Sequence, residues 1–137
     1  MNTIVQRHQG VVTITLPIKT VSEANSHTHW RVRAKRAKAQ RAAAKLSCAA
    51  PFAREGFVTE VFGMPLLAIT MTRISPSAGL DSDNLPSSMK HLRDGVADAL
   101  GVDDRDRRIV WSYAQERGPA KAYAVRIEVR QRGEVAA

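Results

Sequence analysis

The chain has 137 residues and a formal net charge of +8, with 44% hydrophobic and 25% charged residues. This length predicts a single domain over residues 1–137, with a frayed tail after about residue 130. The strongly basic balance indicates a polyanionic partner, for which nucleic acid is the usual candidate. No stretch approaches the roughly 18 apolar residues of a membrane-spanning helix, so the sequence predicts no membrane protein.

The N-terminal residues and the cysteine content both favour a cytoplasmic protein. Residues 1–7 lack the apolar segment of a secretory signal. The single Cys48 has no intrachain disulfide partner and cannot form a zinc site alone. We therefore expect a reducing environment and a small, buried thiol at this position.

The first half of the chain predicts one strand and one helix. Residues 11–18 alternate β-branched residues with threonine, and Pro17 is expected to end the strand or place it at an edge. From Ser26 to about Leu46 the composition favours a helix, which Pro51 is expected to end. Its apolar stripe at helical spacing comprises Trp30, Ala34, Ala37, Ala44 and Cys48.

The predicted helix carries seven lysines and arginines and no acidic residue. A helix face that is merely solvated, which is the alternative interpretation, normally mixes both signs of charge. We therefore expect this surface to contact backbone phosphates. The predicted nucleic-acid-binding residues are Arg31, Arg33, Lys35, Arg36, Lys38 and Arg41.

The second half of the chain predicts three more strands and a second helix. Residues 64–74 read as a central strand, and residues 85–100 as a helix with Gly101 at its C-terminus. Residues 109–116 and 123–130 alternate and are expected to pair as an antiparallel hairpin. The order is β-α-β-α-β-β, which predicts an α+β fold with one mixed sheet and two helices packed on one face.

All seven aspartates lie between Asp81 and Asp106, which makes a compact acidic segment in a basic chain. Asp81 and Asp83 would point to the same side of an extended segment, where two carboxylates repel each other unless a cation lies between them. Asp103 and Asp104 could approach the same point from the far end of the second helix. Carboxylates with water and substrate phosphate are the ligands Mg²⁺ prefers, so the segment indicates a metal-dependent phosphodiesterase.

The spacing of the acidic segment also allows other interpretations. Asp83 or Asn84 could simply cap the second helix, and the later aspartates could form a polar turn. An EF-hand is excluded because Pro86 stands where the invariant glycine belongs. The sequence contains no His-Glu-x-x-His pattern, which argues against a zinc hydrolase, and all four histidines are interpreted as surface or core residues.

A family resemblance appears at these residues. The order Asp81-x-Asp83-Asn84-Leu85, then Lys90, then Asp103-Asp104 resembles the RusA family of Holliday-junction resolvases. The resemblance covers roughly residues 16–129, with Leu16-Pro17-Ile18, Asn25 and Trp30-x-x-Arg33 similar to the N-terminal part of phage members. It implies a small homodimeric endonuclease of phage or prophage type that cuts branched DNA with Mg²⁺, for which Mn²⁺ is a substitute.

The resemblance also implies roles for individual residues. Asp81, Asp83 and Asp104 correspond to the family's metal-binding aspartates, and Lys90 to its catalytic lysine. Here residues 86–89 intervene, so the lysine comes later than in the commoner family spacing.

The overall prediction is a Mg²⁺-dependent, structure-selective endonuclease that resolves four-way junctions in recombination and repair, without a small-molecule cofactor. For Lys90 the alternative is a surface pair with Asp94, one helical turn away. For the chain the alternative is a basic nucleic-acid-binding protein without catalytic activity.

Overall fold

The structure is a computed structural model that describes residues 3–8, 10–21, 29–57, 67–77, 79–80 and 83–131. Its elements follow one another as β1 (Ile4–His8), β2 (Val11–Leu16), α1 (Trp30–Glu55), β3 (Leu67–Ser75), α2 (Asn84–Ser88), α3 (Lys90–Leu100), β4 (Ile109–Arg117) and β5 (Ala124–Gln131). Within these ranges no helix is long and apolar enough to cross a membrane.

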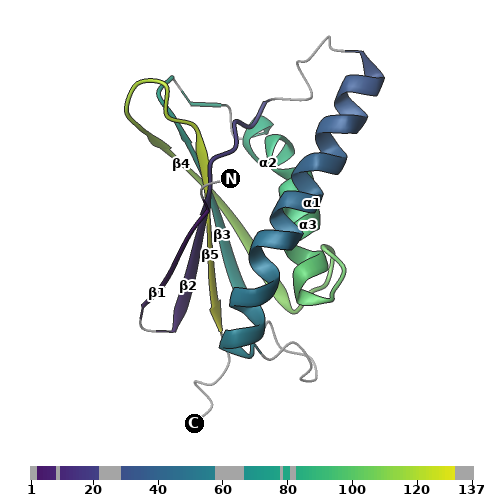
Figure 1. Cartoon of the computed structure of the whole chain (residues 1–137), viewed down its shortest axis with the longest axis vertical. Coiled ribbons are helices and arrows are strands. Elements are labelled where there is room, and N and C mark those ends of the chain that lie inside the picture. The colour runs from purple at the N-terminus through teal and green to yellow at the C-terminus, as the bar shows by residue number, and fades with distance from the viewer. Residues whose placement is uncertain are drawn as a thin grey trace.

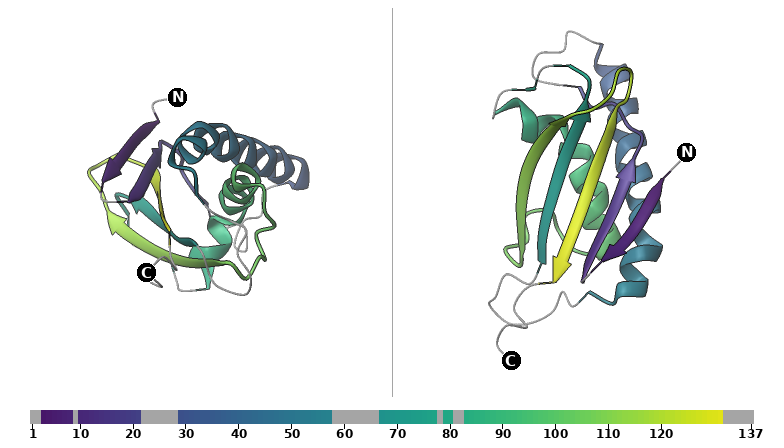
Figure 2. Two further views of the ribbon diagram at one scale, coloured as in Figure 1. Left: turned by 90° about the horizontal axis from the view of Figure 1, so that it is seen from below. Right: turned by 90° about the vertical axis from the view of Figure 1, so that its left-hand side faces the viewer.

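The strands form one mixed sheet in the order β1-β2-β5-β3-β4 (Figure 1). Only β3 and β4 run parallel, and the other neighbouring pairs are antiparallel. The end-on view shows α1 and α3 side by side on one face of the sheet (Figure 2). The predicted α+β class, with a mixed sheet and helices on one face, is therefore confirmed.

The core lies between the sheet and the two long helices. Alternate residues of the strands point inward, as a half-covered sheet requires. The helices supply the opposite wall from one stripe each. The fully buried side chains include Val12, Ile14, Leu16, Ile69, Met71, Val125, Ile127 and Val129 from the strands, and Ala44, Cys48, Leu92 and Val96 from the helices.

The predicted hairpin of the last two strands is wrong. β3 lies between β4 and β5, parallel to the first and antiparallel to the second. Because Val125, Ile127 and Val129 are fully buried, β5 occupies a central place between β2 and β3. The connection from β4 to β5 therefore passes over the end of β3, where the N–H of Gly118 donates to the carbonyl of Ser75.

The expectation that Pro51 ends the first helix is also wrong, because α1 continues to Glu55 with Pro51 inside it. Proline removes one intrahelical hydrogen bond and crowds the preceding turn. The last turn is held by Phe52, which is 4% exposed and packs edge-on against Phe57. Gly56 then ends the helix in the left-handed conformation, at φ 66°.

The predicted apolar stripe of α1 holds only in its second half, where Cys48 is buried as expected. The buried residues of this helix are Gln40, Ala44, Cys48 and Phe52. Trp30 remains 60% exposed and Ala34 is exposed as well, because the first turns of α1 do not pack on the core. The predicted helix start at residue 26 lies outside the described residues.

Two further boundaries differ from the sequence prediction. The expected second helix is divided at Met89 into α2 and α3, while its predicted C-terminus at Gly101 is confirmed by a left-handed φ of 73°. The edge strand β1 was not predicted, because its five residues are all exposed and carry no core pattern. Residues 64–66 of the predicted central strand lie outside the described ranges.

The two long helices approach closely at Gly95. A methyl group added there would lie 2.3 Å from the backbone oxygen of Arg41 and 2.7 Å from the Cβ of Ala44. We expect Gly95→Ala to lower the free energy of unfolding by about 2 kcal/mol, because a backbone oxygen cannot move aside as a side chain can. Urea unfolding measures this change. Helix propensity alone would make the alanine variant at least as stable as the wild type, and that result would contradict the close approach.

Candidate functional site

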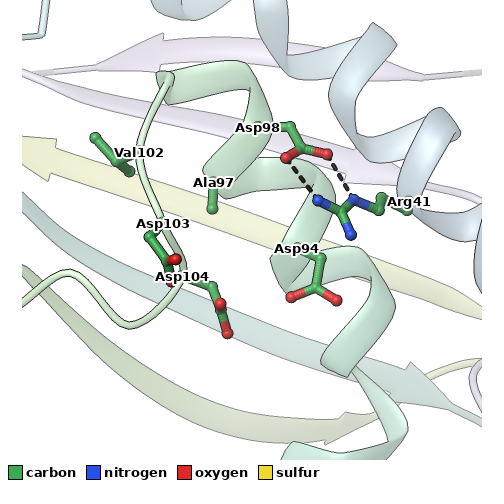
Figure 3. Close-up of a pocket in the computed structure, with 7 residues that line it drawn as sticks. All are labelled: Arg41, Asp94, Ala97, Asp98, Val102, Asp103 and Asp104. Atoms are coloured by element: carbon green, nitrogen blue, oxygen red, sulfur yellow. Dashed lines mark hydrogen bonds and ion pairs between the residues drawn. The ribbon is translucent and has the colours of Figure 1, made fainter.

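Four aspartates line a hollow of about 270 Å³ between α1, α3 and the turn after α3. We call this cavity the acidic hollow. Figure 3 shows the side chains of Asp94 and Asp104 directed into the same space. The hollow is lined by Arg41, Asp94, Ala97, Asp98, Val102, Asp103 and Asp104.

One wall of the acidic hollow is an ion pair between the two long helices. The Nε of Arg41 donates to Asp98 over 2.7 Å and its Nη2 over 2.9 Å. These hydrogen bonds hold the pKa of Asp98 below its ordinary value and raise the pKa of Arg41. Asp98 is therefore committed to Arg41, and this predicted phosphate-binding arginine is engaged with a carboxylate instead.

Asp104, a predicted metal ligand, is held at the hollow through Arg93. The Nη2 of Arg93 donates to the backbone carbonyl of Asp104 over 2.6 Å, and its Nη1 donates to the hydroxyl of Tyr113 over 2.8 Å. The guanidinium also lies 4.5 Å from the ring centre of Trp111. The Nε of Arg93 is 3.6 Å from the Asp104 carboxylate, a loose ion pair that leaves the carboxylate facing the hollow.

The remaining aspartates of the turn after α3 have structural roles. Asp103 accepts from the backbone N–H of Arg105, and Asp106 accepts from the backbone N–H and the guanidinium of Arg108. Both side chains thus satisfy donors within the turn. The polar turn that was the alternative for Asp103 and Asp104 is therefore seen at Asp103.

The ion pair of Asp106 with Arg108 is expected to make the stability of the protein fall at acidic pH. The hydrogen bonds from Arg108 lower the pKa of Asp106 to about 2. A carboxyl whose folded pKa is depressed stabilises the protein fully above its unfolded pKa near 4, and this contribution is lost as the pH falls through about 2. We therefore expect the melting temperature of Asp106→Asn to lie below that of the wild type at pH 6, and the difference to shrink as the pH falls through about 2. A difference in melting temperature that is constant with pH contradicts this role.

Lys90 stands at the start of α3 with its side chain 62% exposed. Its Nζ lies 3.6 Å from the Asp94 carboxylate, the i, i+4 pair that was the alternative to a catalytic role. Such an exposed pair contributes only tenths of a kcal/mol. Lys90 can therefore leave Asp94 for a phosphate at little cost, and Asp94 lines the acidic hollow.

Asp83 precedes α2, where a capping role was the alternative to metal binding. Its side chain makes no capping hydrogen bond, and it is exposed. It is not among the residues that line the acidic hollow, so the structure does not bring it into the same cavity as Asp104. Asp81 lies outside the described residues.

No metal-binding group of three or more histidine, cysteine, aspartate or glutamate side chains occurs within the described ranges. The donor chemistry of Asp83 and Asp104 nevertheless suits a hard divalent cation. Because Asp81 is not described, the predicted set of three ligands stays a prediction.

Gln115 holds the backbone that leads into the Asp81–Asp83 segment, and sequence reasoning missed it. Its Oε1 accepts from the N–H of Leu80 over 2.9 Å, and its Nε2 donates to the carbonyl of Leu80 over 2.8 Å. Gly79 makes this approach possible, since a Cβ there would lie 2.8 Å from the Gln115 side chain. No local pattern identifies such a residue, because its partner is distant in sequence.

The basic face predicted on α1 is present at the start of the helix. Arg31, Arg33, Lys35 and Lys38 are exposed, and Arg36 is half-buried. His29 begins the helix by accepting the N–H of Arg31 at its Nδ1, over 3.1 Å. The first turns of α1, which carry these cations, lie at one end of the molecule (Figure 1).

Comparison with known proteins gives little further identification. No family model matches the chain. An uncharacterized protein of Xylella fastidiosa (strain Temecula1 / ATCC 700964) is 37% identical over 97 residues, which are 69% of this chain. The chain spans 60% of the length of that relative.

Proposed function

We propose that the protein is a RusA-like, Mg²⁺-dependent endonuclease that cuts four-way DNA junctions as a homodimer in the cytoplasm. Its metal ligands would be Asp81, Asp83 and Asp104. The observation that carries the proposal is the state of Asp83. Its carboxylate occupies a helix-capping position yet caps nothing, so a ligand role is not in competition with a structural one.

The character of the acidic residues agrees with metal binding. A bound Mg²⁺ would supply Lewis-acid stabilisation of the negative charge that develops on the phosphate. Asp104 is oriented for this role by Arg93, which holds its backbone carbonyl while leaving the carboxylate toward the hollow. Arg93, on α3, is itself fixed by Tyr113 and Trp111 of β4, so two neighbouring elements support the turn.

Substrate binding and charge stabilisation fall to the cations. Lys90, loosely paired with Asp94, would stabilise charge on the phosphate or the leaving oxygen. The exposed arginines and lysines at the start of α1 would bind backbone phosphates and read no sequence. This division suits a nuclease that selects DNA by its branched shape.

The test is an incubation of labelled four-way junction DNA with the protein, with and without Mg²⁺. The proposal expects retarded DNA without the metal and symmetric nicks with it. Retarded but intact DNA under every metal condition contradicts the nuclease and favours the second candidate, a basic binding protein. The exposed cations of α1 support this second candidate. Linear duplex of the same sequence is the control for junction selectivity.

A further inference from the structure

A buried arginine without a partner lies at the carboxyl end of β3. Arg73 is 8% exposed, and its Nε has no hydrogen-bond partner. No ion pair of Arg73 with any described carboxylate is found. Burying an unpaired guanidinium costs free energy, and a bound anion would offset that cost.

Arg73 lines a pocket of about 300 Å³, the Arg73 pocket, together with Ser77, Gly79, Gln115, Glu116 and Arg117. The register of the parallel strands β3 and β4 explains why Arg117 lies close to Arg73. Arg73 pairs with Gln115 and Ser75 with Arg117, so the two arginines stand two positions apart on the same face of adjacent strands. The pocket is thus built by the sheet itself.

The walls of the pocket orient Arg117 and leave both cations without a carboxylate partner among the described residues. Arg117 donates from its Nε to the carbonyl of Pro76 over 3.2 Å, which orients its guanidinium across the end of β3. The one carboxylate in the lining, Glu116, forms an ion pair with Arg126 on β5. Glu116 is therefore neutralised from outside the pocket, and the excess charge within it is positive.

The pocket adjoins the segment that carries the predicted metal ligands. Gly79 forms part of its wall, and Gln115, another wall residue, binds both backbone polar groups of Leu80. Leu80 is followed directly by Asp81. An anion in the pocket would therefore lie close to Leu80, one residue before Asp81 in the sequence.

We propose that the Arg73 pocket binds a phosphate group, and that this phosphate belongs to the nucleic-acid backbone next to the bond that is cut. Two guanidinium groups offer the forked donors that suit phosphate oxygens. The site would fix the position of the strand relative to Asp83 without reading its bases. The assignment of the phosphate to DNA rests on the proposed function, whereas the presence of a phosphate site does not.

Phosphate binding is tested with inorganic phosphate alone, by following the arginine Nε–Hε signals in nitrogen–proton NMR spectra. The expected result is a saturable shift of the Arg73 and Arg117 signals, which Arg73→Gln removes at Arg117. The exposed Arg130 on β5 is the internal control, and Arg130→Gln should leave the shifts intact. Equal, unsaturable shifts at Arg130 and Arg73, or none at Arg73, overturn the proposal.

The source of the phosphate is tested with junction DNA in a buffer without divalent metal, where binding is measured without cutting. Arg73→Gln should weaken binding about tenfold, and inorganic phosphate should compete with the wild type but not with the variant. Unchanged DNA affinity in Arg73→Gln overturns the backbone assignment. If phosphate binds but Mg²⁺ gives no cutting in the wild type, the nuclease fails and the phosphate site stands.

A stability measurement separates binding from a structural role. Arg73→Met keeps the long aliphatic part of the side chain and removes the unpaired buried charge. We expect its melting temperature without phosphate to equal or exceed that of the wild type, and phosphate to raise the melting temperature of the wild type only. A variant that melts several degrees lower would show that the arginine serves the fold, and would overturn the proposal.

Discussion

Replacing Asp83 by asparagine should reduce junction cutting on the order of 1,000-fold while preserving or strengthening junction binding. The asparagine keeps the size of the side chain and removes one of three proposed carboxylate ligands, which is worth several kcal/mol in stabilising charge on the phosphate. Binding should not suffer, because a negative charge close to the DNA backbone is removed. Single-turnover cutting in Mg²⁺ and binding in Ca²⁺ measure the two effects.

The structure indicates that this substitution is a clean probe. Asp83 is exposed and makes no capping hydrogen bond, so the fold should not depend on its charge. Asp106→Asn is the matched control, with the same change of charge at an aspartate committed to Arg108. Wild-type cutting by the Asp83 variant, or equal losses in both variants, would remove Asp83 from the metal site.

The second large effect is expected at the start of α1. Replacing Arg33 and Lys38 together by alanine should weaken junction binding roughly 10- to 100-fold at 0.1 M salt, because two phosphate contacts are lost. Each lost contact should also reduce the slope of log K against log salt concentration by about 0.9. Both side chains are exposed, and alanine favours the helix. Measuring the dissociation constant between low and high salt gives both the affinity and the slope.

The control for this pair removes the same charge from elsewhere on the surface. Arg54 lies in the last turn of α1 and Arg130 on β5, and both are exposed. Their double alanine variant should keep the salt slope of the wild type. If both double variants lose affinity equally, net charge and not the predicted basic face attracts the DNA.

Local patterns predicted the elements of this fold, while contacts between distant residues decided how they assemble. The spacing of Leu92 and Val96 predicted the buried side of α3, and Gly101 marked its end. The pairing of β4 with β3, and the continuation of α1 through Pro51, depend on which residues the core buries. No alternation within a single strand contains that information.

The same division applies to the candidate site. The acidic segment and the basic helix were visible in the sequence because their residues are neighbours. The pairing of Arg41 with Asp98, the support of Asp104 by Arg93 and the approach of Gln115 to Leu80 join different elements. The unpaired charge of Arg73 is likewise defined only by burial, which the sequence does not display.

The central claim is that folding gathers distant carboxylates around a divalent ion. Its most direct test is the structure of a crystal soaked in Mn²⁺. The anomalous signal of manganese identifies the ion without reference to its ligands. We expect manganese coordinated by oxygens of Asp81, Asp83 and Asp104, at about 2.0 to 2.5 Å. Crystals saturated with Mn²⁺ that hold no ion at these carboxylates would contradict it.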